Sequence, residues 1–251
     1  MAQIALITGA SAGIGEACAK TLAQQKYNLI ITGRRLERLE KLAAELRSEG
    51  IEVLSLQVDV RNRAEVEQKL NTLPEKWRRV DVLINNAGLS VGLEPIHEGD
   101  PDDWDTMIDT NIKGLLYVTK VVSNWMVSNR KGHIVNLGSI AGKETYANGN
   151  VYCATKHAVD SLNNAMRIDL LPYGIKVTGI HPGAVETEFS EVRFKGDRER
   201  AKKVYEGFTP LTAQDIAETV LFAISRPPHV NINDLLIMPT AQANSSYLLK
   251  K

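Results

Sequence analysis

Short apolar runs recur along the chain and alternate with longer stretches of helical period. Each run places Ile, Val or Leu on consecutive positions, which is typical of strands that are covered on both faces. The pattern therefore predicts a sheet buried between two layers of helices. The predicted strands are Ile4–Thr8, Leu29–Thr32, Val53–Val58, Val82–Asn85, His133–Leu137, Val177–Ile180 and Leu235–Met238.

The stretches between the runs have the spacing of amphipathic helices. Residues 36–46 carry one stripe of Leu and Ala, while the charged residues between them face away. Pro74 and Pro172 are each predicted to stop a helix, because proline cannot continue one. Thr212, followed three residues later by Asp215, has the pattern of a helix start.

Repeated strand–helix alternation predicts an α/β fold with one doubly wound parallel sheet of the Rossmann type. No internal repeat or linker interrupts it, so residues 1–251 are predicted to form a single domain. Residues 181–208 differ, since they show no clear element before Asp197–Tyr205. A segment of this kind in a compact domain is typical of a substrate-binding loop or lid.

Composition narrows the class of protein. The formal net charge is +0, which predicts neither a nucleic-acid partner nor an anionic membrane partner. Cys18 and Cys153 match no disulfide framework, and the apolar run Ile4–Ile7 is too short for a signal core. The histidines show no HxxxH pair or cysteine partner, so no metal site is predicted. We expect a cytoplasmic protein that acts on a small molecule.

A glycine-rich loop follows the first predicted strand. It contains Gly9, Gly13 and Gly15, with Ser11 and Ile14 between them, and an alanine-rich helix follows. Glycines allow a pyrophosphate to approach the backbone N–H groups, and a helix N-terminus adds partial positive charge. A glycine trio is also compatible with a simple tight turn. Its position in the first βαβ unit favours dinucleotide binding.

The end of the second strand indicates which dinucleotide is bound. An NAD site has an acidic residue there for the ribose hydroxyl, but this chain has Gly33, Arg34 and Arg35. Arginine forms charge-assisted hydrogen bonds with a 2′-phosphate, so we predict NADP. Asp59, followed by Val60, ends the third strand, where it would either meet the adenine amino group or cap the next helix.

A candidate for proton transfer follows the fifth strand. Tyr152 and Lys156 lie four residues apart on a predicted helix, so their side chains share one face. A free tyrosine has a pKa near 10, and a lysine cation nearby favours its phenolate. Tyr152 would then exchange a proton with an alcohol or carbonyl as hydride moves. Ser139, upstream, would hydrogen-bond the reacting oxygen.

These motifs together resemble the short-chain dehydrogenase/reductase family over essentially the whole chain. The resemblance implies a Rossmann-type domain that commonly forms a homotetramer, with a homodimer as the alternative. The motifs that carry it are Thr8-Gly9-x-x-x-Gly13-x-Gly15, Asn85-Asn86-Ala87-Gly88, Asn111, Ser139, Tyr152-x-x-x-Lys156 and Pro182-Gly183.

The same resemblance implies residue roles. Asn111 would hold a water in a proton relay that runs from Tyr152 through the cofactor ribose and Lys156. Lys156 would also bind the nicotinamide ribose, and Tyr152 would lie beside the nicotinamide. The further residues that would line the cofactor are Asn86, Ala87, Gly88, Pro182, Gly183, Val185 and Thr187.

A narrower resemblance is to one subgroup, the NADP-dependent 3-hydroxy acid (serine) dehydrogenases. It implies oxidation of L-serine, 3-hydroxyisobutyrate or 3-hydroxypropionate, or reduction of malonic semialdehyde. The segments that carry it are 32–39, 59–63, 107–111, 149–152, 188–197 and 229–233.

The substrate itself is less firmly predicted than the reaction. Arg193 and Lys195, in the loop that would close over the nicotinamide, are candidate partners for a substrate carboxylate, although solvated loop charges are an equal interpretation. Which of the two would contact the substrate stays open. A broad carbonyl reductase or a 3-oxoacyl-thioester reductase would use the same catalytic residues. A catalytically silent NADP-binding regulatory protein is the alternative of a different class.

Overall fold

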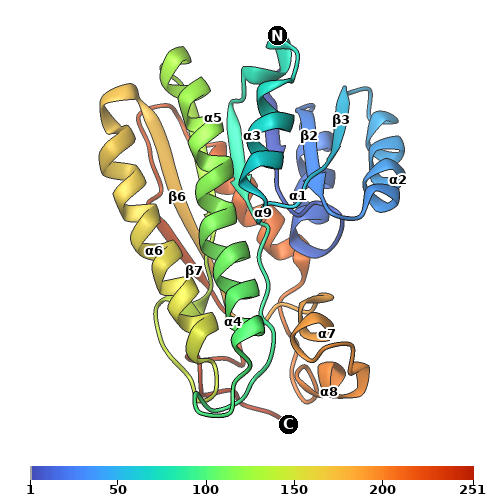
Figure 1. The fold of residues 1–251 in the computed structure, drawn as a ribbon, viewed down its shortest axis with the longest axis vertical. Helices are drawn as coiled ribbons and strands as arrows, with labels where there is room; N and C mark the ends of the chain where they lie inside the picture. Colours follow the sequence, from blue (N-terminus) through green and yellow to red (C-terminus); the bar gives the residue numbers. More distant parts are fainter. Residues whose placement is uncertain (1) are drawn as a thin grey trace.

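The computed structural model describes residues 2–251. Seven parallel strands form one sheet in the order β3-β2-β1-β4-β5-β6-β7, which confirms the predicted doubly wound class (Figure 1). The strands are β1 (Ile4–Ile7), β2 (Asn28–Gly33), β3 (Val53–Gln57), β4 (Val82–Asn85), β5 (Gly132–Leu137), β6 (Ile175–Pro182) and β7 (Asp234–Ile237).

Helices cover both faces of the sheet. The α-helices are α1 (Gly13–Gln24), α2 (Leu36–Arg47), α3 (Arg63–Asn71), α4 (Pro101–Ile108), α5 (Leu115–Asn129), α6 (Asn150–Leu170), α7 (Phe189–Arg193), α8 (Arg198–Lys203) and α9 (Ala213–Ile224). The shorter turns are η1 (Glu75–Arg78), the π-helix η2 (Asp109–Gly114), η3 (Ile140–Gly142) and η4 (Leu171–Tyr173). Among residues 2–251 no helix has the length and apolar character to cross a membrane.

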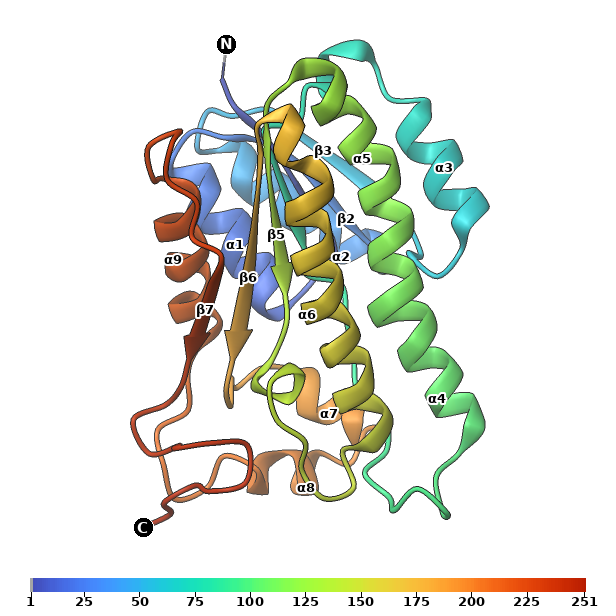
Figure 2. The same ribbon diagram turned by 90° about the vertical axis from the view of Figure 1, so that its left-hand side faces the viewer.

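The core consists of two apolar layers separated by the sheet. Alternate residues of β1 point to opposite faces, because successive side chains of a strand do so. Ala5 and Ile7 pack with α1, α2 and α9, whereas Ile4 and Leu6 pack with α3, α5 and α6. Figure 2 shows these two helix layers on either side of the strands. The near-continuous apolar runs are thus explained by burial on both faces.

Local signals set several helix ends as predicted. Thr212 and Asp215 form the capping box of α9, in which each side chain accepts a hydrogen bond from the other residue's backbone N–H. The helix α3 ends at Asn71, before Pro74, and α6 gives way to η4, which contains Pro172. The apolar stripe in residues 36–46 is the buried face of α2.

The segment predicted as a loop contains one helix that the sequence did not reveal. Within residues 181–208, α7 precedes α8, and β6 extends to Pro182. Five residues make little more than one turn, too short for an apolar period to be recognised. We call residues 187–208, which carry α7 and α8, the lid. Figure 2 shows the lid and the C-terminal tail beyond the tips of β6 and β7.

The order of the sheet fixes where a ligand can bind. The chain passes outward from β1 to β3 in one direction and from β4 to β7 in the other. Neighbouring strands β1 and β4 therefore mark the switch point, where a crevice opens beyond the carboxyl ends of the strands. The glycine loop follows β1 and the Asn86 segment follows β4 at this place.

Candidate active site

A cleft of about 650 Å³ opens at the switch point, within the usual range for ligand sites. Predicted site residues from widely separated segments meet in it. Those that line the cleft are Gly9, Ser11, Gly13, Ile14, Arg34, Arg35, Asp59, Val60, Asn86, Ala87, Gly88, Ser139, Tyr152, Lys156, Pro182, Gly183, Val185, Thr187 and Arg193. Gly15 and Asn111 are not among the lining residues.

The glycine loop is held in a shape that only glycine adopts easily. Gly9 has φ +67° and Gly13 has φ +56°, both in the left-handed region. A Cβ on Gly9 would lie 3.0 Å from the Asn86 side chain and from the Ala87 backbone. Gly15 serves packing instead, since its Cβ would lie 2.5 Å from the carbonyl oxygen of Gly9. The start of α1 therefore faces the cleft with its first N–H groups free for an anion.

Asn86 fastens this loop to the end of β4. Its side-chain Nδ2 donates to the carbonyl oxygens of Thr8 at 2.9 Å and Gly9 at 3.2 Å. In return, the Thr8 Oγ1 accepts hydrogen bonds from the backbone N–H groups of Asn86 and Ala87 at 3.0 and 2.9 Å. These four bonds explain why the two motifs, far apart in sequence, form one surface.

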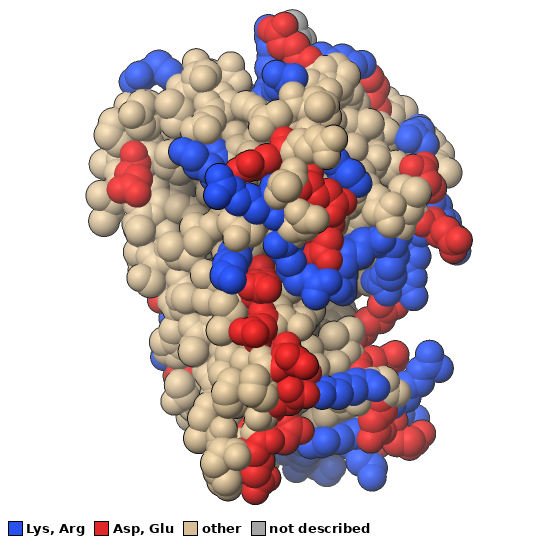
Figure 3. Space-filling model, in the orientation of Figure 1, with Lys and Arg blue, Asp and Glu red and all other residues tan. Residues whose placement is uncertain are grey.

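Two arginines stand at the end of the cleft that follows β2. The Arg35 guanidinium donates to Ser11 Oγ through Nε and Nη2, at 3.3 and 3.2 Å. Its Nη1 pairs at 2.9 Å with Glu188 of the lid, which also pairs with Arg38 at 2.7 Å. Hydrogen bonds from Arg38 and Arg35 hold the pKa of Glu188 below its usual value. Arg34 lines the same end of the cleft, and Figure 3 shows Lys and Arg gathered beside a hollow on this face.

Asp59 lines the cleft and does not cap a helix. Its carboxylate accepts hydrogen bonds from Nε and Nη2 of Arg61, the shortest at 2.6 Å, and these bonds lower its pKa. The N-cap of α3 is Asn62, whose side chain accepts from the backbone N–H of Glu65 at 3.1 Å. The helix-cap interpretation of Asp59 is therefore wrong, because Asn62 is the residue that satisfies the first turn of α3.

Tyr152, Ser139 and Lys156 meet where α6 passes the end of β5. Ser139 lines the cleft together with Tyr152, whose ring lies 6.0 Å from the Lys156 Nζ. The Lys156 ammonium donates to the Leu137 carbonyl at 2.8 Å, and burial lowers its pKa to about 8. Burial raises the pKa of Tyr152, while the nearby Arg193 charge and the Ser139 hydrogen bond act against that rise. The three side chains have the geometry for exchanging a proton.

Asn111 lies one layer behind the cleft wall, in the π-helix η2. Its Oδ1 accepts from the backbone N–H of Leu89 at 2.9 Å, and its Nδ2 donates to the Leu89 carbonyl and to Thr155 Oγ1. A Cβ on Gly88 would lie 3.3 Å from the Asn111 Oδ1 and 3.6 Å from the Lys156 Nζ. Asn111 and Lys156 thus approach Gly88 from the same side. A π-helical turn inside a long helix is a frequent feature of functional sites.

Arg193 projects from the end of α7 against the proton-transfer group. Its guanidinium carbon lies 5.2 Å from the centre of the Tyr152 ring and 5.0 Å from that of Phe189. Its Nη2 donates to the hydroxyl of Tyr146 at 3.1 Å. Among residues 2–251, no carboxylate pairs with Arg193 in the structure. The alternative of a solvated loop charge is wrong, because the side chain is partly buried in the cleft.

Several lining residues were not predicted from the sequence. The tail contributes through Gln242, whose Oε1 accepts from the backbone N–H of Ala184 at 2.8 Å. Nothing in the pattern of the tail or lid signals such contacts, since they depend on chain crossings far from the motifs. The lining residues that were missed include Tyr146, Glu188, Phe189, Tyr205, Phe208, Gln242, Ser245, Ser246 and Leu248.

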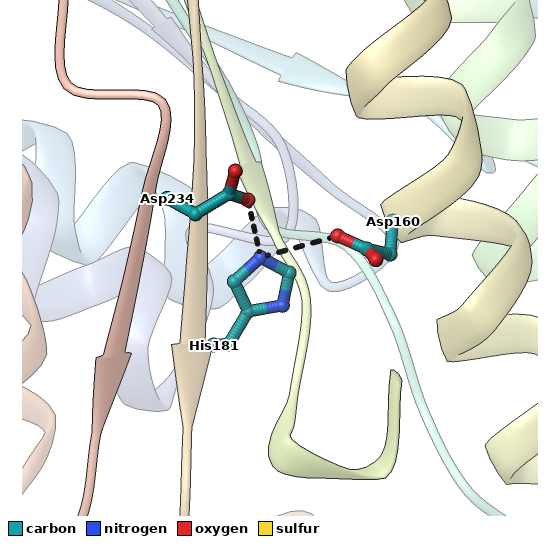
Figure 4. A group of neighbouring side chains, drawn as sticks. All are labelled: Asp160, His181 and Asp234. Carbon is teal, nitrogen blue, oxygen red and sulfur yellow. Dashed lines mark hydrogen bonds and ion pairs between the residues drawn. The ribbon is translucent and has the colours of Figure 1, made fainter. Parts of the chain in front are cut away.

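A cluster of charged side chains braces the end of β6 beside the site. His181 Nε2 lies 3.0 Å from Asp234 and 3.6 Å from Asp160 (Figure 4). These three residues together have the donor types of a metal site. The carboxylates are, however, already paired with Lys143, at 2.6 Å from Asp160, and with Arg167, at 3.3 Å from Asp234. The cluster links α6, β6 and β7 immediately before Pro182.

Replacing Lys156 with methionine is expected to raise the free energy of unfolding by about 2 kcal/mol near pH 7. The fall in pKa from 10.5 to about 8 corresponds to a cost of about 3 kcal/mol for burying the charge. Removing the charge removes this cost, but the variant also loses the hydrogen bond to Leu137, which offsets about 1 kcal/mol of the stabilisation.

The same change should show a characteristic pH dependence. The unfolded lysine keeps its proton up to the usual lysine pKa of 10.5, and the folded lysine keeps it only up to about 8. The cost of burying the Lys156 charge therefore lowers the stability of the parent in full below about pH 8, and it disappears as the pH rises to 10.5. Urea unfolding of both proteins at pH 7 and near pH 10 measures the difference. A variant less stable than the parent at pH 7 would contradict the expectation.

The fold and the cleft define an α/β dinucleotide-binding protein with a proton-transfer group. Comparison with known proteins gives its family. The short chain dehydrogenase family matches residues 3–198, and the chain belongs to this family. It is therefore an oxidoreductase.

Individual relatives match almost the whole chain. The NADP-dependent 3-hydroxy acid dehydrogenase of Salmonella typhi is 51% identical over 242 residues, which cover 96% of each protein. Sulfoacetaldehyde reductase 2 of Chromohalobacter salexigens is 44% identical over 252 residues, covering 100% of both. The solved closed form of a serine dehydrogenase complexed with NADP⁺ has a TM-score of 0.94 and 46% identity, covering 99% of this chain and 100% of that one.

Proposed function

We propose that this protein is an NADP-dependent dehydrogenase of small 3-hydroxy acids. The candidate substrates are L-serine, 3-hydroxyisobutyrate and 3-hydroxypropionate, with malonic semialdehyde in the reverse direction. The observation that carries the proposal is Arg193, a cation without a carboxylate partner among residues 2–251, held against Tyr152 inside the cleft. The relatives named above act on 3-hydroxy acids, serine or sulfoacetaldehyde.

The residues of the cleft fit NADP. The left-handed glycines Gly9 and Gly13 leave room for a pyrophosphate beside the start of α1. We assign Arg34 and Arg35, with Ser11, to the 2′-phosphate and Asp59 with Val60 to the adenine; in support, all five line the cleft and Arg35 donates to Ser11. The related 3-hydroxy acid dehydrogenase is NADP-dependent and the related serine dehydrogenase was solved with NADP⁺, and NADP is the cofactor of this chain.

The nicotinamide end of the cleft would be formed by the segments after β4 and β6. The proposed contacts come from residues that line the cleft there, and their backbones are fixed by the sheet: the Gly183 N–H donates to the Ile237 carbonyl at 2.7 Å. NADP, when bound, supplies the acceptor for the hydride that leaves the substrate. The residues proposed to contact the nicotinamide end are Asn86, Ala87, Gly88, Pro182, Gly183, Val185 and Thr187.

The proton leaves through the hydroxyl group of Tyr152. Ser139 holds the reacting substrate oxygen by a hydrogen bond, which places its proton next to Tyr152. Lys156 stabilises the phenolate as a cation and binds the ribose hydroxyls. Asn111, whose side chain meets Gly88 from the same side as Lys156, holds the water that passes the proton onward. In the reductive direction Tyr152 gives its proton to the carbonyl oxygen.

The substrate carboxylate would pair with Arg193. The guanidinium uses one N–H for Tyr146, while the buried Nε has no hydrogen-bond partner in the described residues. A charge-assisted hydrogen bond to a carboxylate would satisfy it. The cation also sits directly beside Tyr152, so a bound acid would hold its hydroxyl only a few carbons away. This short span favours small acids over acyl thioesters.

Replacing Arg193 with methionine is expected to raise KM for hydroxy acids by about 10- to 100-fold, the value of one charge-assisted hydrogen bond. KM for neutral secondary alcohols should change much less. NADPH formation with L-serine, 3-hydroxyisobutyrate, 3-hydroxypropionate and 2-butanol measures both. Arg200→Met is the matched control, because Arg200 is an exposed lid arginine that stacks on Phe194.

Two outcomes would contradict the acid assignment. One is an equal rise in KM for acids and neutral alcohols in the Arg193 variant. The other is parent activity confined to the neutral alcohols, which would favour a broad carbonyl reductase. A chain that binds NADP but turns over none of these compounds in either direction would favour the regulatory alternative.

We further propose that residues 1–251 act as a single domain and that the chain assembles as a homotetramer in the cytoplasm. The apolar side chains of Ile168 in α6 and Leu171 at the start of η4, each 73% exposed, support association with further copies. This part of the proposal rests on the oligomeric state that is common in the family rather than on the geometry of the site.

A further inference from the structure

We infer that Arg193 has a second role, as a positioning residue that acts on Tyr152: when the lid is closed, its guanidinium stabilises the phenolate form of the tyrosine. The inference rests on the proposed function of Tyr152 in proton transfer. It does not depend on which substrate carries the proton. Arg193 would thus serve neutral and acidic substrates alike.

The side chain of Arg193 is held in place from three directions. It lies over the rings of Tyr152 and Phe189, at 5.2 and 5.0 Å, and the two ring centres are 5.6 Å apart. The hydroxyl of Tyr146 accepts a hydrogen bond from the Arg193 Nη2, with 3.1 Å between nitrogen and oxygen. A cation fixed at this distance from an ionisable ring acts on both protonation states, but it favours the charged one far more.

The lid supplies the charge. Arg193 is the last residue of α7, and Glu188, just before α7, is tied to Arg35 and Arg38 across the cleft. The backbone N–H of Gly92 also donates to the carbonyl of Arg193 at 3.0 Å. The guanidinium therefore occupies its place beside Tyr152 only while the lid lies against the body of the protein.

The other groups around Tyr152 do not provide an equivalent permanent charge. On α6, Lys156 lies 6.0 Å from its ring and Cys153 is its neighbour in the same apolar cluster. Ser139, after β5, presents a neutral hydroxyl, which accepts from the backbone N–H of Ala141 at 3.1 Å. The lid adds Tyr205, which is neutral and bonded to Ser190 at 2.7 Å.

Acidic groups also approach Tyr152 from the α4 side. Glu94 and Asp103 line a small cavity that touches Tyr152. Asp103 is paired with Lys195 at 2.8 Å, which compensates its charge. Burial, rather than these acids, is the largest influence that disfavours the phenolate of Tyr152, and a nearby cation opposes it.

Lys156 and Arg193 differ in how they hold their protons. Burial lowers the pKa of Lys156 to about 8, so its charge is lost in mildly alkaline solution. An arginine keeps its proton throughout the range in which proteins are stable. Among the influences that lower the pKa of Tyr152, the charge of Arg193 is the largest. The stable cation of the pair is therefore the one on the lid.

The pH dependence of kcat/KM for oxidation of 2-butanol, at saturating NADP⁺, tests the inference. This substrate has no carboxylate, so the measurement excludes acid binding. Arg193→Met should move the acidic limb of the profile up by about one unit or more. Arg193→Lys, which restores a cation, should return the limb close to its original position. Arg200→Met, on the same lid, should leave it unchanged.

A titration without turnover gives a second reading. The ultraviolet absorbance of the Tyr152 phenolate is followed with pH in the NADP⁺ complex, as the difference from the same variant carrying Tyr152→Phe. The Arg193→Met protein should titrate at higher pH, by about the same one unit or more. This experiment succeeds even if 2-butanol is turned over too slowly to assay.

Equal shifts in the methionine and lysine variants, or no shift in either, would overturn the inference. Equal shifts would mean that Arg193 only supports the lid as a structural element. Failure of the proposed substrate class looks different: acids would lose their advantage over neutral alcohols, while the titration of Tyr152 would still respond to the charge at position 193.

Discussion

Replacing Tyr152 with phenylalanine is expected to lower kcat by about a thousandfold, which is the usual contribution of a positioned acid or base. The change removes the hydroxyl that exchanges the proton but keeps the ring that packs with Phe189 and Arg193. NADP binding, measured by cofactor fluorescence, and the thermal midpoint should stay close to those of the parent. Oxidation of a hydroxy acid and reduction of its aldehyde should fall by the same factor, since one group serves both directions.

The matched control is Tyr173→Phe. Tyr173 lies in η4, is 36% exposed and is absent from the cleft lining. Its loss should leave kcat within about twofold of the parent, as for most surface changes. A Tyr152 variant that kept more than about a tenth of the parent kcat would contradict its role in proton transfer, because a positioned acid or base contributes at least a hundredfold.

Removing both cleft arginines, as Arg34→Gln with Arg35→Gln, should lower the preference for NADP over NAD by about 100- to 1,000-fold. Each charge-assisted hydrogen bond to the 2′-phosphate contributes about 1.5–3 kcal/mol, and the two contributions overlap. NAD carries no phosphate at this position, so its kcat/KM should change little. The measurement is the ratio of kcat/KM for the two cofactors with one substrate.

The ratio is used because Arg35 has a second partner. It also pairs with Glu188 of the lid, and a looser lid would affect both cofactors equally. Lys41→Met is the control, since Lys41 is an exposed cation on α2 and is not part of the cleft. An unchanged ratio in the double variant would assign recognition of the 2′-phosphate to other groups.

The fold was predictable because its strands are buried on both faces. Such strands need apolar residues at consecutive positions, so each one is visible in the sequence as a short run. The observed β1 to β7 agree with the predicted runs to within about two residues. The largest difference is at β6, which extends two residues beyond each end of its predicted run; near its start lies the polar Lys176, whose Nζ reaches the carbonyls of Arg226 and Val230.

The lid and the tail were not predictable in the same way. The helix α7 has one turn, and its position is fixed by contacts across the cleft, such as Glu188 with Arg35. Gln242 reaches the backbone of Ala184 from the C-terminal tail. Neither contact produces a periodic pattern in the sequence, because each depends on where two distant segments cross.

Arg193 shows how the tertiary structure decides between interpretations that the sequence leaves open. From the sequence its charge could be a substrate anchor or a solvated residue of a loop. The structure brings it to 5.2 Å from the Tyr152 ring and bonds it to Tyr146. Its significance comes from that environment, and a residue's environment is a property of the folded chain.

The sequence alone determined the alternation of strands and helices, the glycine loop, the pair of arginines after β2 and the spacing of Tyr152 and Lys156. These are local features, because a turn, a helical face or a strand end is encoded by neighbouring residues. Only the tertiary structure decided that Asn111 lies behind Gly88 and that the lid delivers Arg193 to Tyr152. Such juxtapositions arise from the packing of segments far apart in the chain, which no local pattern records.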